Sequence, residues 1–184
     1  MEEEFQVLNV PFEGRTDRTI EYIQLIKNHW ENHPSTFKGN YYSFSDVTFY
    51  PKPKQKKLPI WMGGNSDHVI ERALEHADGW QPIWFSTNEL RDKISFLHKI
   101  AGEKSINIDD FDISLRNRIQ LTAHRGTDDH PPSALIGSKE EIFEKILSYG
   151  DLRIKEVVLD FITPNKNETI ETMQILSEEL IPNL

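Results

Sequence analysis

The chain has 184 residues, no cysteine and a formal net charge of −9, with 37% hydrophobic and 28% charged residues. This composition predicts a globular protein with one ordinary core, and the negative charge argues against a nucleic-acid-binding surface, which needs a basic field. The lack of cysteine excludes disulfides, thiolate metal sites and a cysteine nucleophile, and it is consistent with the reducing cytoplasm.

Membrane and secretion signals are not expected either. No apolar run approaches the length of a bilayer span, and the opening "MEEEF" has no apolar signal region. We therefore expect a cytoplasmic protein with no membrane partner.

The first expected elements are a helix and a hairpin. "TDRTIEYIQLIKNHW" repeats apolar residues at helical spacing and predicts a helix over 17–30. The next stretch, "HPSTFKGNYYSFSDVTFYPKP", predicts two short strands, 42–44 and 47–50, around a turn at Ser45-Asp46.

From residue 58 onward, short apolar runs alternate with amphipathic helical segments. The expected strands are 58–62, 79–85, 112–122 and 156–162, and the expected helices are 66–77, 88–101, 139–149 and 168–180. Ser138 and Glu141 form a capping-box pattern at the start of the third of these helices. Such alternation predicts an α/β fold with a parallel sheet and crossover helices. Two architectures remain open: a doubly wound sheet, and four units of a β/α barrel, which needs about 250 residues when complete.

The turn "GGNS" follows the first of these strands. Gly63 and Gly64 end the strand, and Asn65 and Ser66 precede the helix. One interpretation is a tight turn. The other is an anion site, because bare backbone lets a phosphate approach the N–H groups and the positive dipole end of the helix. The P-loop lysine and the third glycine of a dinucleotide fingerprint are both missing.

The second strand is preceded by "ADGW" and is rich in aromatic residues. Asp78-Gly79 is a common helix-to-strand turn pair. Trp80, Trp84 and Phe85 fit either the wall of a pocket for a planar ligand or ordinary core packing.

Other catalytic signals are weak. "HRGTDDHPP", at 124–132, holds two histidines and two aspartates but lacks regular ligand spacing, so we expect no metal site. The sequence contains no Gly-x-Ser-x-Gly elbow and no evident pair of acid–base carboxylates. We assign no catalytic residue.

Three blocks of the sequence carry a family resemblance: "EEEFQVLNVPFEGRTDRTIEYIQLIKNHW", "FKGNYYSFSDVTFYPKPKQKKLPIWMGGNS" and "RALEHADGWQP". In order and spacing they resemble the second half of a luciferase-like monooxygenase, a superfamily that uses flavin or the deazaflavin F420. The resemblance is strong from Glu2 to Pro82 and weaker beyond. Two positions depart from the family pattern, which has glycine at Asn9 and usually an acidic residue at Gly14.

The resemblance implies a partial (β/α)₈ TIM barrel that forms a single domain over 1–184. Residues 1–31 would follow the fourth strand, 32–57 would be an insertion, and 58–184 would be the last four βα units. It also implies FMN or F420 as the cofactor, bound at the carboxyl ends of the strands. The residues implied in contact with its phosphate region are Gly63, Gly64, Asn65 and Ser66 and, more weakly, Gly79 and Trp80.

The expected function is therefore that of a flavin- or F420-dependent oxidoreductase or monooxygenase acting on a small molecule. Alternatives are a non-catalytic half-barrel that binds a phosphate-bearing ligand or a partner subunit, and an unrelated open α/β domain. The hairpin and "PKP" blocks argue against the last.

Half of a barrel has two open sheet edges and an uncovered face. We expect Val157 or Val158, and Leu159 or Ile162, to lie on that face. Such edges and apolar faces favour association. The expected partner is a second copy of the chain or a separately encoded N-terminal half-barrel.

Overall fold

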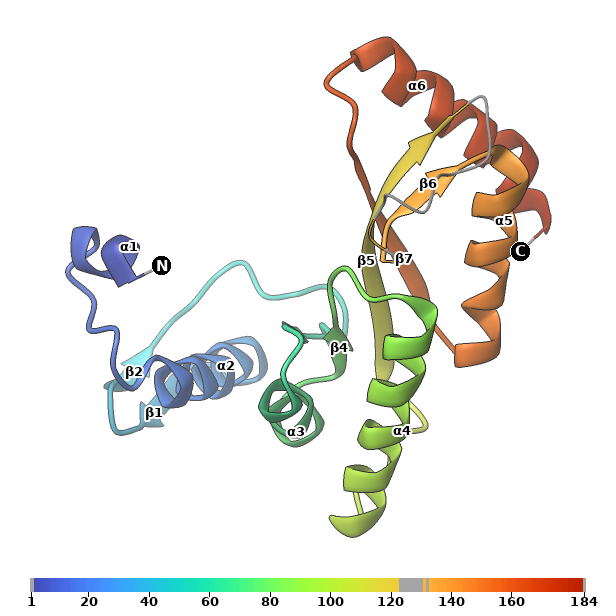
Figure 1. Ribbon diagram of the computed structural model, residues 1–184. Helices are drawn as coiled ribbons and strands as arrows, with labels where there is room; N and C mark the ends of the chain where they lie inside the picture. The colour runs from blue at the N-terminus through green and yellow to red at the C-terminus, as the bar shows by residue number, and fades with distance from the viewer. Residues whose placement is uncertain (1, 123–130, 132, 184) are drawn as a thin grey trace. The chain divides into compact units, whose positions relative to one another are not determined.

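The structure is a computed structural model that describes residues 2–122, 131 and 133–183. It divides into two compact units, Met1–Ile60 and Trp61–Leu184, which are described separately (Figure 1).

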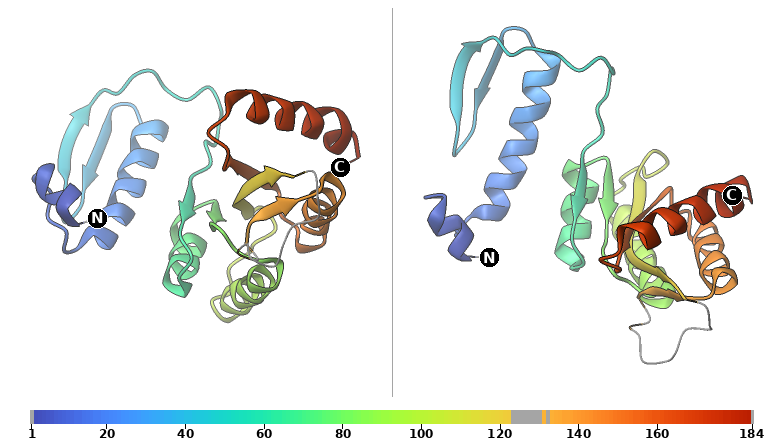
Figure 2. Two further views of the ribbon diagram at one scale, coloured as in Figure 1. Left: turned by 45° about the horizontal axis from the view of Figure 1, so that its top comes forward. Right: turned by 90° about the horizontal axis from the view of Figure 1, so that it is seen from above.

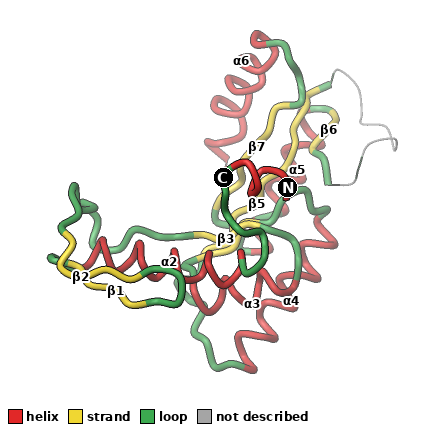
Figure 3. Tube along the Cα trace, turned by 90° about the vertical axis from the view of Figure 1, so that its left-hand side faces the viewer, coloured by secondary structure: helices red, strands yellow, loops and turns green. Residues whose placement is uncertain are grey.

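The first unit combines helices with an antiparallel hairpin. Its elements are α1 (Glu2–Val7), α2 (Arg15–Glu31), β1 (Ser35–Lys38) and β2 (Ser43–Val47). Figure 3 shows the hairpin running beside α2. The predicted helix over 17–30 is confirmed, but the predicted strand pair is wrong, because 43–47 is one strand and the turn precedes it.

The position of this turn is determined by a carboxylate from α2. Glu21, 6% exposed, accepts backbone N–H bonds from Asn40 at 2.7 Å, Tyr41 at 2.9 Å and Tyr42 at 2.7 Å. A Cβ built on Gly39 would lie 2.3 Å from that carboxylate, so the turn needs glycine there. The contact joins residues about twenty positions apart, and no local turn signal reveals it.

Both departures from the family pattern lie at left-handed backbone positions. Asn9 has φ 53°, a conformation that glycine adopts freely and asparagine tolerates. Gly14 has φ 67°, and an added Cβ would meet the Tyr41 hydroxyl at 3.0 Å. Glycine therefore suits the entry into α2.

The second unit is an α/β fold. Its strands are β3 (Trp61–Gly63), β4 (Gly79–Gln81), β5 (Asp112–Leu121), β6 (Leu135–Gly137) and β7 (Glu156–Phe161). Its helices are α3 (Asp67–His76), α4 (Thr87–Glu103), α5 (Lys139–Ser148) and α6 (Lys166–Ile175), with short helical turns η1 (Gly150–Leu152), η2 (Leu176–Leu180) and η3 (Ile181–Asn183).

The sheet is parallel, and its order β3-β4-β5-β7 confirms the predicted arrangement. β6 is an additional strand that was not predicted, and it pairs with the carboxyl end of β5. Ile119 of β5 pairs with Leu135 of β6 on one side and with Phe161 of β7 on the other. β3 begins three residues later than predicted. Within the described residues the sheet does not close into a barrel.

One face of this sheet is covered by helices (Figure 2). On β5, Leu115 and Ile119 are fully buried in the core beneath them, whereas Arg116 and Arg118 are exposed on the opposite face. Since directly paired residues point to the same face, Val158 lies on the open face with Arg116.

The open face is more polar than the sequence suggested. Of the two alternatives in each expected pair, the register places Val158 and Ile162 on this face, and Val157 and Leu159 on the helix side. Polar members of the open face include Gln81, Ser114, Arg116, Arg118, Glu156 and Asp160. All of these except Arg118 form cross-strand contacts, including Gln81 Nε2 to Ser114 Oγ at 2.9 Å.

Candidate functional site

The turn at residues 63–66 joins the carboxyl end of β3 to the start of α3. Gly64 has φ 134°, which side-chain-bearing residues rarely adopt, and a Cβ there would approach Val69 at 3.1 Å. Its N–H donates to the Gln81 carbonyl at 3.3 Å. Its carbonyl accepts a 2.8 Å bond from Nε1 of the fully buried Trp80. Both the N–H and the carbonyl of Gly64 are therefore hydrogen-bonded to residues of β4.

Asn65 connects the same turn to the chain beyond β4. Its Nδ2 donates to the Ile83 carbonyl at 2.8 Å, and its Oδ1 accepts from the Ile83 N–H at 3.0 Å. Both the nitrogen and the oxygen of the Asn65 amide are therefore hydrogen-bonded to the backbone of Ile83, so this side chain holds the turn at residues 63–66 in place.

The start of α3 differs from the starts of the next two helices in the unit. Ser86 and Ser138 form complete capping boxes with Glu89 and Glu141 at α4 and α5, which confirms the box predicted at Ser138. Ser66, the N-cap of α3, makes no side-chain capping bond. The Val69 N–H already donates to the Ser66 carbonyl at 2.9 Å. The N–H groups before it in a first helical turn have no acceptor within their own helix, so an uncapped start leaves them for another group.

An acidic side chain also lies at this helix start. Asp67 is the first residue of α3, and its carboxylate accepts a 2.6 Å bond from Lys93 Nζ. The ammonium group offsets a negative charge that would otherwise oppose an anion at this position.

Gly79 and Trp80 have packing roles beside the turn. A Cβ on Gly79 would lie 2.6 Å from both the Asp112 carbonyl oxygen and the Trp61 ring, so no side chain fits. Phe85 is buried with Trp80 in the core, whereas Trp84 is 43% exposed. The structure thus brings the predicted residues together at the ends of β3 and β4; their contact with a cofactor stays a prediction.

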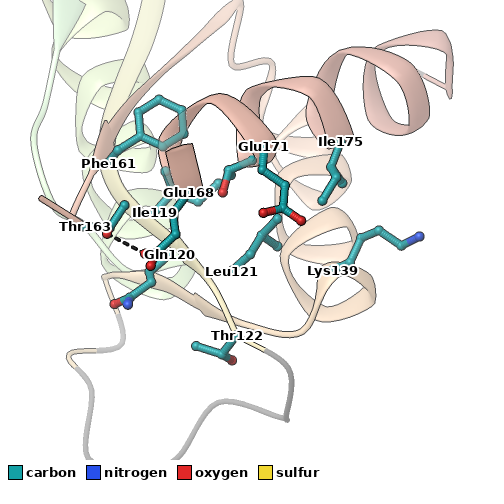
Figure 4. Close-up of a pocket in the computed structure, with 11 residues that line it drawn as sticks. Ile119, Gln120, Leu121, Thr122, Lys139, Phe161, Thr163, Glu168, Glu171 and Ile175 are labelled. Carbon is teal, nitrogen blue, oxygen red and sulfur yellow. Dashed lines mark hydrogen bonds between the residues drawn. The ribbon is translucent and has the colours of Figure 1, made fainter. Parts of the chain in front are cut away.

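A second feature, a pocket of about 340 Å³, lies where β5 and β7 end, beside α5 and α6 (Figure 4). It is lined by Ile119, Gln120, Leu121, Thr122, Lys139, Phe161, Thr163, Glu168, Glu171, Thr172 and Ile175. Glu168 accepts bonds from Thr163 Oγ1 at 2.6 Å and Asn165 Nδ2 at 3.0 Å. Sequence reasoning missed this pocket because it arises from how α6 packs, which no motif encodes.

Neither metal ligands nor a membrane helix is found in the described part of the chain. No group of three or more His, Cys, Asp or Glu residues there is placed to hold a metal ion. The stretch at 124–132 lies, except for residue 131, outside the described residues. No described helix combines the length and apolarity needed to cross a membrane.

Comparison with known sequences gives a family match over most of the chain. The family model for luciferase-like monooxygenases matches residues 1–129. The FMNH(2)-dependent dimethylsulfone monooxygenase of Pseudomonas putida is 33% identical over 89 residues, which are 46% of this chain and 23% of that enzyme.

Solved structures share the fold. The monooxygenase RslO1 from Streptomyces bottropensis superposes with a TM-score of 0.77 at 16% identity, over 98% of this chain and 65% of its own. An F420-dependent secondary alcohol dehydrogenase, solved with an F420-acetone adduct, gives 0.72 at 17% identity, over 91% and 61%. The chain thus covers less than two thirds of each of these proteins.

Proposed function

Because this chain belongs to the family of luciferase-like monooxygenases, we propose that it is part of a flavin- or F420-dependent oxidoreductase whose cofactor phosphate binds at residues 63–66. The observation that carries the proposal is the uncapped start of α3 directly after two glycines, at the carboxyl end of a parallel strand. Ligands of α/β folds bind at this end of the strands.

Each residue of the turn has a distinct part in this proposal. Gly63 and Gly64 leave room for a phosphate, and the Ser66 hydroxyl and the first N–H groups of α3 donate hydrogen bonds to it. Asn65 and Trp80 hold the turn in place. The bound cofactor supplies the redox chemistry, and this chain positions it and provides the electrostatic environment.

The direct test is to titrate the purified chain with FMN and, separately, with F420, and to measure the fluorescence of each cofactor during the titration. We expect saturable quenching by one of them, and weaker binding when inorganic phosphate competes. If neither cofactor binds in the presence of a barrel partner, the cofactor proposal is wrong.

We further propose that the small-molecule reaction requires a partner, either a second copy or a separately encoded N-terminal half-barrel. In the described residues β7 pairs along one edge only, with β5. Beside it a groove of about 780 Å³ runs between α5, β7 and the last helices. Its apolar lining comprises Ile146, Leu147, Tyr149, Ile154, Val157, Leu159, Phe161, Met173, Leu176, Leu180 and Ile181.

An open edge next to an apolar groove favours association through strand pairing and burial together. Size-exclusion chromatography with light scattering over a dilution series tests this. A monomer of 21.5 kDa that persists at low concentration and binds no hydrophobic dye would count against a second copy.

The alternative function is a non-catalytic half-barrel, which the open sheet favours. It predicts cofactor or phosphate binding without turnover even when the partner is supplied. The cytoplasmic location expected from the lack of cysteine stays a prediction.

A further inference from the structure

Trp84 has a backbone conformation that is costly for a bulky residue. Its φ is 56°, in the left-handed region that few residues other than glycine, asparagine and aspartate enter. Its N–H donates to the Arg116 carbonyl at 2.9 Å, and the preceding residue, Ile83, is held at both N–H and C=O by Asn65. Strain of this kind persists only when the surroundings impose it, and it concentrates at functional sites.

The guanidinium group of Arg118 lies over the exposed ring of Trp84. The Arg118 Cζ lies 4.1 Å from the ring centroid, within the range of a cation–π contact. The register partner of Arg118 on β7 is Asp160. Its carboxylate, however, binds Arg116 with both oxygens, at 2.8 and 2.9 Å. Asp160 therefore offsets the charge of Arg116, and in the described residues Arg118 is left with the indole.

A guanidinium that lies on an indole is held in place while the N–H groups along its edge remain directed away from the ring. That edge matches two oxygens of a carboxylate or phosphate in bidentate geometry. We propose that Arg118 and Trp84 form a binding site for a small molecule that carries such an oxyanion. The site lies on the open face of the sheet near the carboxyl end of β5 and does not depend on flavin binding at residues 63–66.

The test titrates the full chain with sodium benzoate and, separately, with inorganic phosphate, while NMR follows the Arg118 Nε–H and Trp84 indole N–H signals. Benzamide, which has the same ring without the charge, is the control ligand. We expect benzoate to shift both signals and benzamide to shift neither. A response to phosphate as well assigns a general oxyanion site, and a response to benzoate alone assigns a carboxylate site.

Three arginine variants decide the role of the guanidinium. Arg118→Gln should weaken benzoate binding at least tenfold, and Arg118→Lys should weaken it less because the charge remains without the planar edge. Arg91→Gln, an exposed arginine on α4 that contacts Asn88, is the matched control and should bind like wild type. Equal benzoate affinity in Arg118→Gln and wild type would overturn the proposal, as would equal binding of benzamide and benzoate.

Trp84 variants separate binding from structure. Trp84→Gly relieves the strained φ, so we expect an unchanged or higher Tm together with weaker benzoate binding. Trp84→Phe keeps a ring beneath the guanidinium and should retain most of the affinity. Full benzoate affinity in a folded Trp84→Gly variant would show that the indole has no part in the site.

Discussion

The indole Nε1 of Trp80 donates a 2.8 Å hydrogen bond to the carbonyl oxygen of Gly64, sixteen residues earlier in the chain. This bond joins the buried core of the sheet to the turn that we propose for the cofactor phosphate. The shape of the turn therefore depends on a residue that itself need not touch the cofactor.

Replacing Trp80 with phenylalanine should disturb both stability and binding. The Gly64 carbonyl loses its donor, and an unsatisfied buried polar group costs about 1–3 kcal/mol. We expect a lower urea midpoint and a weaker FMN or F420 titration. Trp30→Phe, in the first unit, should leave cofactor affinity unchanged. If a measurably destabilised Trp80→Phe protein binds the cofactor with wild-type affinity, the hydrogen bond from Trp80 to Gly64 is not needed for cofactor binding.

Gly64→Val should impair the turn directly. Valine is strained at φ 134° and would crowd Val69, so we expect a loss of about 1–3 kcal/mol in unfolding free energy. We also expect weaker binding of a phosphate-bearing flavin. Gly64→Ala, with its smaller side chain, should show smaller losses of stability and of flavin affinity. Gly102→Ala in α4 meets no atom within 4 Å and serves as the control, with a gain of up to about 1 kcal/mol. Unchanged flavin affinity in folded Gly64→Val would exclude this turn as the phosphate site.

The stability of the first unit should depend on acid through Glu21. Burial acts to raise the pKa of this carboxyl, but its bonds to the N–H groups of Tyr41, Tyr42 and Asn40 outweigh burial and hold the pKa below the ordinary value of 4.5. A depressed folded-state pKa means that the stabilisation is complete above the unfolded pKa and is lost as pH falls through the folded value. Near-UV circular dichroism from pH 7 down to pH 2 measures this loss.

Glu21→Gln is the matching control for that experiment. It removes the charge that holds the turn, so the unit should be less stable at neutral pH and lose this component of its acid dependence. A variant with the wild-type pH profile would show that another group titrates.

Hydrogen exchange should reveal the open edge of β7. The Ile162 N–H donates to the Ile119 carbonyl, so regular alternation turns the N–H groups of Val157, Leu159 and Phe161 away from β5. In the monomer these three amides should exchange faster than those between them. A partner that adds a strand there should abolish the difference, and slow exchange at all positions of a proven monomer would contradict the open edge.

Local signals were enough to predict the alternation of strands and helices and the capping box at Ser138, because these depend on residues a few positions apart. The hairpin was misplaced because its turn is bound by Glu21, a contact across about twenty residues. The candidate site divides in the same way. Its glycines are visible in the sequence, but the contacts of Asn65 with Ile83 and of Trp80 with Gly64 appear only after the strands pair.

The paired charges on the open face of the sheet determine how association through that face depends on salt. Arg116 and Asp160 form an ion pair with one another, so this part of the surface is stable in contact with water. Contacts made through it would weaken as salt screens the charges. Contacts made through the apolar groove beside α5 would instead strengthen in sulfate, which favours burial of apolar surface. The ionic composition of the buffer would thus select which surface of the molecule associates.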